Sequence, residues 1–189
     1  MIPMEYAGIG ERLVRHPASP CEAVAQIAVS VTRPAPHRLA LHYAVAGQIR
    51  NLSLPAPASA MRADGLWQHT CFEVFVRAMP GDDYREFNFA PSHAWAAYRF
   101  DSYRSGIRLQ DMVVVPRIET ELAESQFKLR AELGIDDLPD EAAWQVGLSA
   151  VIEETNGRRS WWALAHPPGQ PDFHHGDCFA RLVPPPSPP

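Results

Sequence analysis

The chain has 189 residues, of which 46% are hydrophobic and 21% are charged, and this composition excludes a largely disordered protein. The net charge of -5, without any run of lysine or arginine, gives no electrostatic basis for binding nucleic acid or an anionic membrane. No segment approaches the roughly 20 apolar residues of a membrane span, and residues 1–13 lack the apolar stretch of a secretory signal.

Alternating hydrophobicity indicates that most of the chain forms β-strands. Between residues 23 and 32, apolar side chains such as Ile27, Val29 and Val31 alternate with more polar ones, which is the period of a half-buried strand. The same alternation recurs from 39 to 45. Further strands are predicted at 49–54, 71–78, 84–90, 95–100, 112–116, 127–133, 144–154, 160–165 and 178–183.

Turn signals between these strands favour a single all-β domain. The strongest is Asn156-Gly157, because both residues tolerate the positive φ of a type I′ hairpin turn. About ten strands without a long amphipathic helix predict an antiparallel β-sandwich, with one short helical turn at 135–141. We expect one domain over residues 1–183 and a disordered, proline-rich tail over residues 184–189.

The cysteines bear on the compartment. Cys21, Cys71 and Cys178 are odd in number and widely separated, which is a poor basis for a disulfide framework. A reducing environment fits this pattern, so we expect a cytoplasmic protein.

The first candidate binding residues lie around the predicted strand 71–78. Trp67 and His69 precede the strand, and the two-residue period places Glu73 on the same sheet face as His69. An indole, an imidazole and a carboxylate at one site can recognise a polar ligand. The structural alternative is that Glu73 pairs across the sheet with an arginine such as Arg85.

The predicted strand 84–90 sorts its side chains in the same way. Glu86 and Asn88 fall on one face, and Arg85 falls on the other. Together, Glu86 and Asn88 offer donors and acceptors to the hydroxyl groups of a ligand, and they could equally form an internal polar network. Further along the chain, Trp95 and Tyr98 are expected in the core.

The last third of the chain is richest in ring side chains. Trp161 and Trp162 are adjacent, so on a strand they point to opposite faces and only one of them can belong to a given site. His166, His174 and His175 follow in a proline-containing loop. Indole rings and hydrogen-bonding imidazoles beside such a loop suit the recognition of a flat polar ligand.

A metal site is the alternative interpretation of this C-terminal segment. His174, His175, Asp177 and Cys178 are possible ligands, and the strand containing Cys71 could add more. The ligand spacing of structural zinc sites is absent, however. We therefore expect neither a metal ion nor another cofactor.

Enzyme signatures are also absent. The sequence has no Walker loop, no dinucleotide-binding fingerprint and no metalloprotease helix motif. Ser149 lies in Gly147-Leu148-Ser149-Ala150-Val151, which lacks the final glycine of a nucleophile elbow. We therefore expect no catalytic residues, although Glu73 or Asp172 could in principle supply a carboxylate for glycoside hydrolysis.

Four segments of the chain form a recognisable set. They are WQHTCFEVFV from Trp67, YREFNFAPSHAWAAY from Tyr84, WQVGLSAVIEE from Trp144 and PDFHHGDCFARL from Pro171. Together, across residues 67–183, they resemble the DOMON-like β-sandwiches, which include the family 9 carbohydrate-binding modules and related haem- or sugar-binding domains. The resemblance implies an immunoglobulin-like sandwich with a non-catalytic ligand site on one sheet or its bordering loops.

The resemblance also implies roles for individual residues. Stacking is implied for Trp67 and for one of the two adjacent tryptophans, and polar contacts are implied for Glu73, Asn88 and His174. Haem-binding relatives use methionine and histidine as axial ligands, and no methionine of this chain aligns with that position. The expected ligand-binding set is Trp67, His69, Glu73, Arg85, Asn88, Trp161, Trp162, His166, His174 and His175.

These observations favour a cytoplasmic module that binds a carbohydrate or a similar polyhydroxylated small molecule without catalysis. Three alternatives stay open. One is a haem- or metal-binding sandwich using His69, His174 or His175, and another is a glycoside hydrolase-like enzyme. The third is a structural or protein-interaction domain whose aromatic side chains all lie in the core.

Overall fold

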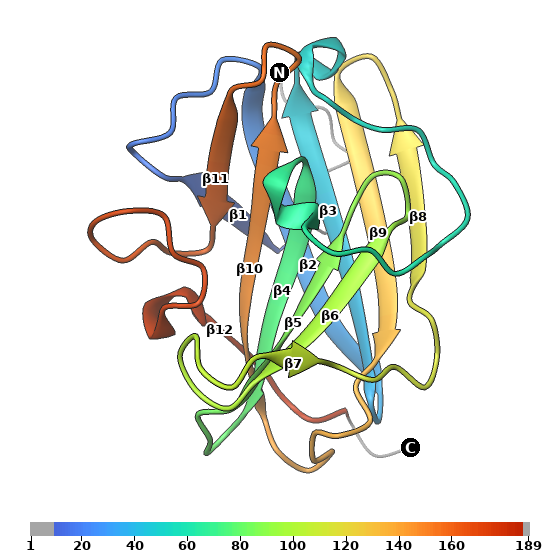
Figure 1. Cartoon of the computed structure of the whole chain (residues 1–189), viewed down its shortest axis with the longest axis vertical. Coiled ribbons are helices and arrows are strands. Elements are labelled where there is room, and N and C mark those ends of the chain that lie inside the picture. The colour runs from blue at the N-terminus through green and yellow to red at the C-terminus, as the bar shows by residue number, and fades with distance from the viewer. Residues whose placement is uncertain (1–9, 187–189) are drawn as a thin grey trace.

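The computed structural model describes residues 10–186, which fold almost entirely into β-strands (Figure 1). The strands are β1 (Glu11–Arg15), β2 (Val24–Ala35), β3 (Arg38–Gly47), β4 (Cys71–Ala78), β5 (Tyr84–Phe89), β6 (Trp95–Phe100), β7 (Arg108–Leu109), β8 (Arg117–Leu122), β9 (Gln126–Gly134), β10 (Trp144–Glu153), β11 (Arg159–Ala163) and β12 (Arg181–Val183). Three single 3-10 turns are η2 (Ile49–Asn51), η3 (Leu66–Gln68) and η4 (Gly176–Cys178). No helix in this part of the chain is long and apolar enough to cross a membrane.

The strands pair antiparallel in the order β7-β6-β5-β4-β10-β11-β1-β2-β3-β9-β8, and β12 pairs with β10. Strand β1 pairs with β11 on one side and with β2 on the other, so it joins two layers. The front layer in Figure 1 holds β4, β5, β6 and β10, and the back layer holds β2, β3, β8 and β9. The prediction of an antiparallel all-β fold is confirmed, with twelve strands in residues 10–186 rather than about ten. The immunoglobulin-like arrangement stays a prediction.

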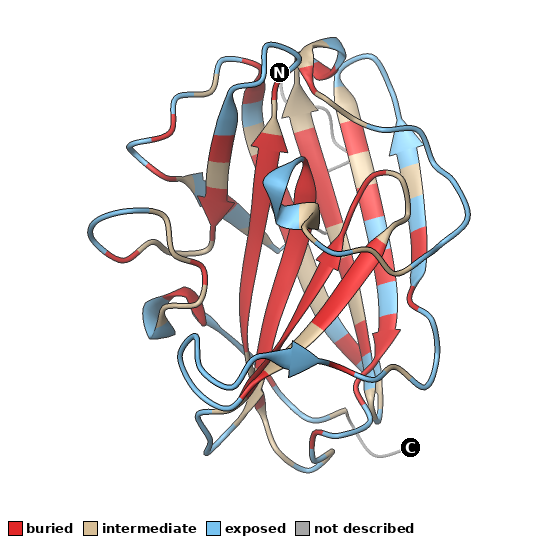
Figure 2. Ribbon diagram, viewed as in Figure 1, coloured by how far each residue is buried: buried red, intermediate tan, exposed pale blue. Residues whose placement is uncertain are grey.

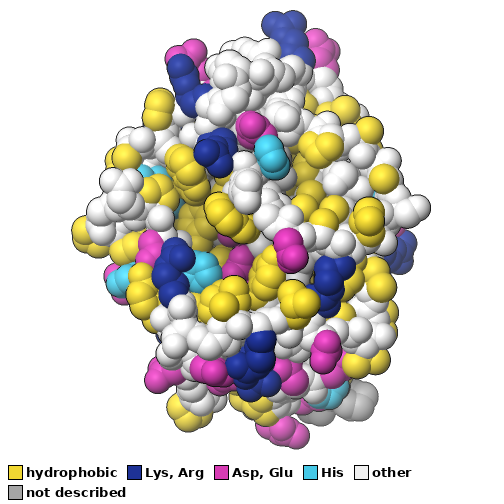
Figure 3. Space-filling view, in the orientation of Figure 1, with side chains coloured by type: hydrophobic (Ala, Val, Ile, Leu, Met, Phe, Trp, Pro, Cys, Tyr) yellow, Lys and Arg dark blue, Asp and Glu magenta, His cyan; other side chains and the backbone are white. Residues whose placement is uncertain are grey.

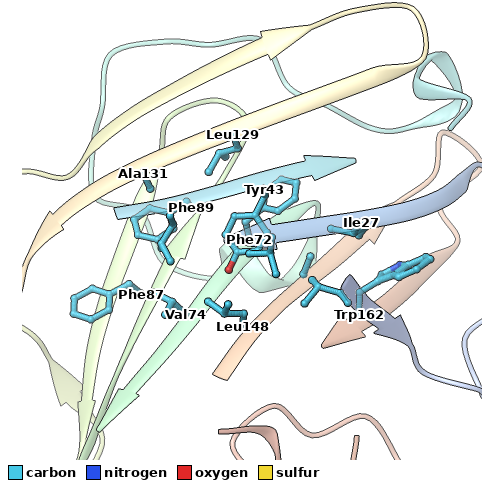
Figure 4. Packing of buried hydrophobic residues seen from close by; sticks show 14 of the residues in the cluster. Ile27, Tyr43, Phe72, Val74, Phe87, Phe89, Leu129, Ala131, Leu148 and Trp162 are labelled. Carbon is cyan, nitrogen blue, oxygen red and sulfur yellow. The ribbon is translucent and has the colours of Figure 1, made fainter. Parts of the chain in front are cut away.

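The main core lies between these two layers. Phe72 of the front layer packs against Tyr43 and Phe127 of the back layer, with ring centroids 5.1 and 5.8 Å apart. Figure 4 shows Val74 and Leu148 of the front layer on the same side as Phe72, with Ile27 and Leu129 of the back layer across from them. Removing this apolar surface from water is the main stabilising contribution, at about 25 cal/mol per Å².

The front layer is buried on its second face as well. Every residue of β5 and the first six of β4 are buried, which Figure 2 shows as continuous red ribbons. On this second face, Phe75, Tyr84, Phe100 and Phe179 form a smaller apolar cluster. The chain around η4 covers part of the face so closely that a Cβ on Gly147 would lie 2.9 Å from the carbonyl oxygen of Cys178. Only part of this face is therefore open.

Two predicted strands are wrong. Residues 49–54 begin with the turn η2 and contribute only an isolated bridge from Leu52 to Glu154. Residues 112–116 form no strand, because Val113, Val114 and Val115 are exposed in a loop before β8. An apolar run without alternation does not distinguish a strand from an exposed loop.

Two predicted turns differ in type from those observed. Residues 135–141 form non-helical turns rather than a helical one. In the β10–β11 hairpin, the N–H of Gly157 donates to the carbonyl of Glu154 at 2.8 Å. Gly157 has a positive φ, whereas Asn156 does not. This is a type I turn followed by a left-handed glycine, not a type I′ turn. Of the predicted tail, residues 184–186 have no regular structure and 187–189 lie outside the described residues.

Candidate ligand-binding site

The open part of the front layer's second face is a hollow of about 1060 Å³. Side chains of β4, β5, β6, β10 and β11 line it, together with η3 and the loops that contain Arg104 and His174. Figure 3 views the protein from this side and shows hydrophobic, acidic, basic and histidine side chains gathered around the hollow. The two-residue period of the strands explains this lining, because every second side chain leaves the core and faces the hollow.

Two tryptophans from distant parts of the sequence line the hollow. Trp67 lies on the 3-10 turn η3 and is 52% exposed. Trp161 lies on β11 and is half-buried. The turn that carries Trp67 begins after Gly65, whose φ of 73° is left-handed and favours glycine. The hollow therefore has exposed indole surface on two of its elements.

Carboxylic side chains lie deep in the hollow. Glu73 of β4 and Glu86 of β5 both line it, although they are only 2% and 6% exposed. The Ser149 hydroxyl donates to Glu73 Oε2 at 3.3 Å, and the Asn88 amide donates to Glu86 Oε1 at 2.8 Å. Burial raises the pKa of Glu73 well above its ordinary value, and the charge of Glu86 raises it further. Burial raises the pKa of Glu86 to about 7, against the opposing effect of the Asn88 hydrogen bond.

His174 lies beside these carboxyls and is held by aromatic neighbours. Its ring packs edge-on against Phe75 and Phe100, with centroids 5.0 and 5.1 Å away, and its Nδ1 lies 2.8 Å from the Tyr84 hydroxyl. The backbone N–H of Arg104 donates to that hydroxyl, which can donate its own proton to Nδ1. Burial lowers the pKa of His174 to about 4, with a smaller effect from Arg104, so the ring is neutral at pH 7. Its Nε2 then carries the proton.

Polar contacts hold the loops at the rim of the hollow. Arg104 donates to Asp172 Oδ1 at 2.7 Å, and Tyr103 donates to the second oxygen of Asp172 at 2.5 Å. The Tyr98 hydroxyl donates to Asp64 Oδ1 at 2.9 Å. These bonds connect loops that lie far apart in the sequence and fix the entrance to the hollow.

The structure brings together part of the predicted ligand-binding set. Trp67, Glu73, Trp161 and His174 line the hollow. Asn88 does not line it, but it lies buried beside the carboxyls and is bonded to Glu86.

Three other predicted residues do not line the hollow. Arg85 faces away and donates to Asp137 and Asp83 at 2.6 and 2.5 Å, so it is not the partner of Glu73. Trp162 belongs to the main core, as expected for one of two adjacent tryptophans on a strand. The Nε2 of His166 lies 2.8 Å from the carbonyl oxygen of Val14, a contact on the neighbouring strand β1.

The last two predicted residues lie near the hollow without lining it. His69 lies 2.8 Å from Glu153 in a second hollow of about 580 Å³, which shares Asp64, Gly65 and Gln68 with the first. His175 packs edge-on against Tyr103, and its Nδ1 accepts from the backbone N–H of Asp177. In residues 10–186, no three side chains of His, Cys, Asp or Glu lie close enough to hold a metal ion.

Several lining residues are missing from the predicted set. Alternation could have found Phe75, because it shares a face with Glu73, and Tyr98, which lies directly opposite Glu86 in the β5–β6 register. The expectation of Tyr98 in the core is therefore wrong, whereas Trp95 is buried there. Asp64 and Arg104 lie in loops, where no periodic pattern marks a side chain's direction.

The fold is found in solved structures of carbohydrate-binding proteins. A candidate carbohydrate-binding protein from Bacteroides uniformis is similar with a TM-score of 0.70 and 15% identity, over 96% of this chain and 88% of that one. A family 9 carbohydrate-binding module from Caldicellulosiruptor kristjanssonii, in complex with glucose, gives a TM-score of 0.56 and 10% identity, over 97% and 87%. No protein-family model and no curated protein matches the sequence. At these identities the similarity establishes a shared fold.

Proposed function

We propose that this protein is a non-catalytic module that binds a carbohydrate, or a similar polyhydroxylated small molecule, in the hollow between Trp67 and Trp161. The observation that carries the proposal is that these two indoles line one hollow together with Glu73 and Glu86, although they lie 94 positions apart in the sequence. A sugar ring presents C–H groups to an aromatic face and hydroxyl groups at its edge. Indole surface beside buried polar groups therefore complements both parts of the sugar.

The dimensions of the hollow and the fold support the same proposal. A volume of about 1060 Å³ is close to the upper end of the range for small-molecule sites, about 300–1,000 Å³, so it accommodates one or a few sugar rings. Both similar structures are described as carbohydrate-binding, and one of them holds glucose. We propose membership of the DOMON-like sandwiches on the same grounds. A cytoplasmic location is supported by the three free cysteines, Cys21, Cys71 and Cys178.

The test is a titration of the full chain with a panel of mono- and disaccharides, followed by tryptophan fluorescence and calorimetry. We expect saturable binding of at least one sugar, and we expect Trp67→Ala and Trp161→Ala each to weaken it. Leu122→Ala is the matched control, because it also removes an exposed apolar side chain (71% exposed) but lies on β8 in the other layer. Absence of binding across the panel would favour the alternative of a protein-interaction domain.

A glycoside hydrolase is the second candidate, because two carboxylic side chains with raised pKa values, Glu73 and Glu86, face one hollow. A raised pKa is typical of the general acid in such enzymes. The test is turnover of a panel of chromogenic glycosides by the wild type, Glu73→Gln and Glu86→Gln. Turnover that both substitutions abolish would establish the enzyme, and absence of turnover in the wild type would rule out this candidate for that panel.

A further inference from the structure

We infer that the hollow selects a sugar that carries an ammonium group, such as an amino sugar, and that Glu86 is the residue that recognises this group. The inference rests on the proposed carbohydrate-binding function and names the ligand class of the same site. Its basis is an excess of buried hydrogen-bond acceptors on β4 and β5, together with a carboxyl that has no cationic side chain bonded to it.

The deep part of the hollow holds more acceptors than donors. Glu73 Oε1 and Asn88 Oδ1 are both buried and have no hydrogen-bond partner. Two donors of this region are already used, since the Ser149 hydroxyl bonds Glu73 Oε2 and the Asn88 amide bonds Glu86 Oε1. Buried acceptors without a partner are costly, so these two oxygens require a proton or a ligand.

Protonation would turn Glu73 Oε1 into a donor, and Asn88 Oδ1 on the neighbouring strand is an unpartnered buried acceptor. Glu73 and Asn88 lie directly opposite each other in the β4–β5 register, and such pairs have Cβ atoms about 4.5–5.5 Å apart. A carboxyl proton on Glu73 Oε1 can therefore be donated to Asn88 Oδ1. The raised pKa of Glu73 agrees with this protonated form, since burial and the charge of Glu86 both oppose its ionisation. Glu86 is then the carboxyl of this pair that ionises near neutral pH.

No cationic side chain is bonded to Glu86, although the charge of Arg104 lowers its pKa to a lesser extent than burial raises it. The groups that titrate or carry charge around it are Glu73 and Cys71 from β4, Tyr84 from its own strand, Tyr98 from β6, and His174 and Arg104 from the loops. The Nε2 of His174 lies 3.7 Å from Glu86 Oε2, but this ring is neutral at pH 7. Arg104 is already paired with Asp172 at 2.7 Å. The other arginine that lines the hollow, Arg108, is paired with Asp101 at 2.7 Å.

An ammonium group complements this arrangement better than a hydroxyl group does. A hydroxyl can donate one hydrogen bond to Glu86 Oε2, but it leaves the buried negative charge in place. An ammonium donates a charge-assisted hydrogen bond, roughly twice as strong as a neutral one, and also compensates the charge. Acetylation of the amine removes its charge and should remove this advantage.

The experiment compares D-glucosamine, D-glucose and N-acetyl-D-glucosamine as ligands of the full chain by calorimetry at pH 7 and pH 5. At pH 7 we expect D-glucosamine to bind at least about tenfold more tightly than either neutral sugar. With a pKa of about 7, about half of Glu86 is ionised at pH 7 and about 1% at pH 5. The affinity for D-glucosamine should therefore fall about tenfold at pH 5, to the level of the neutral sugars, whereas its amine stays charged.

Two variants assign the effect to Glu86. Glu86→Gln keeps the acceptor for the Asn88 amide but cannot ionise, so the ratio of the D-glucose and D-glucosamine dissociation constants should fall toward one. Glu124→Gln is the matched control: it also removes one negative charge, from the exposed turn between β8 and β9 in the other layer, and the ratio should not change.

The outcomes separate this inference from the proposed function. Equal or tighter binding of the neutral sugars at pH 7 overturns the inference and leaves the carbohydrate site intact. A preference for the amine that persists at pH 5 also overturns it, because Glu86 is then protonated and cannot be its cause. The pH comparison uses the wild type alone, so it remains decisive if Glu86→Gln does not fold. Absence of binding by all three sugars and by the wider panel removes the proposed function and the inference with it.

Discussion

The buried carboxyl of Glu86 should make the stability of this protein depend on pH in a direction that the structure fixes. Burial raises its pKa from 4.5 to about 7. A carboxyl whose folded pKa is raised stabilises the fold while it is protonated. Its contribution is therefore complete below about pH 4.5 and is lost as the pH rises through about 7. A difference of about 2.5 between the folded and unfolded pKa corresponds to about 3 kcal/mol, of which about 2 to 3 kcal/mol is lost between pH 5 and pH 9.

The perturbation is Glu86→Gln, because the amide has a similar shape and does not titrate. The measurement is the free energy of unfolding in urea, followed by tryptophan fluorescence, for the wild type and the variant at one-unit steps from pH 5 to pH 9. We expect the difference, wild type minus variant, to fall by about 2 to 3 kcal/mol across this range.

The free energy of unfolding must be compared between wild type and variant at each pH, because His174 makes stability depend on pH in the opposite direction. Its folded pKa is lowered to about 4, so below its ordinary value of 6.5 the unfolded chain takes up a proton that the folded protein does not. This lowers stability as the pH falls, and it is common to both proteins. Glu124→Gln is the matched control, because it removes an exposed carboxyl in the other layer. A difference between wild type and Glu86→Gln that stays constant within about 0.5 kcal/mol would refute the burial argument for Glu86.

Further expectations concern binding and packing. Trp161→Ala should weaken sugar binding by about 2 kcal/mol, or about thirtyfold, whereas Trp162→Ala should cost about 3–5 kcal/mol of stability in urea unfolding, because it opens a cavity in the core. If both substitutions affected only stability, Trp161 would be no part of the site. Arg85→Ala should destabilise the fold by about 2 kcal/mol, and the figure is kept low because both aspartate partners of Arg85 are partly exposed. It should leave the preference among sugars unchanged in calorimetry. Gly147→Ala should cost about 1–3 kcal/mol in the same unfolding measurement, because the added methyl would lie 2.9 Å from the Cys178 carbonyl oxygen. A neutral result would show that η4 moves freely.

Alternation in the sequence determined most of the long strands and the division of their side chains between two faces. The predicted strands 71–78 and 95–100 match β4 and β6 at both ends. The same period placed Glu73 on the opposite sheet face from Phe72. It also required Trp161 and Trp162 to point to different faces. These features are local, since a strand reverses the direction of its side chains at every residue whatever it packs against.

Only the tertiary structure decided which face became the core and which became the hollow. Alternation could not choose between Trp161 and Trp162, because the choice depends on the pairing of β11 with β1 and β10. Arg85 finds its partner Asp137 52 residues away, and Arg104 and Asp64 reach the hollow from loops. These contacts depend on the order of strands in the sheet and on the paths of loops, which are set by the packing of segments far apart in the chain and leave no periodic trace in the sequence.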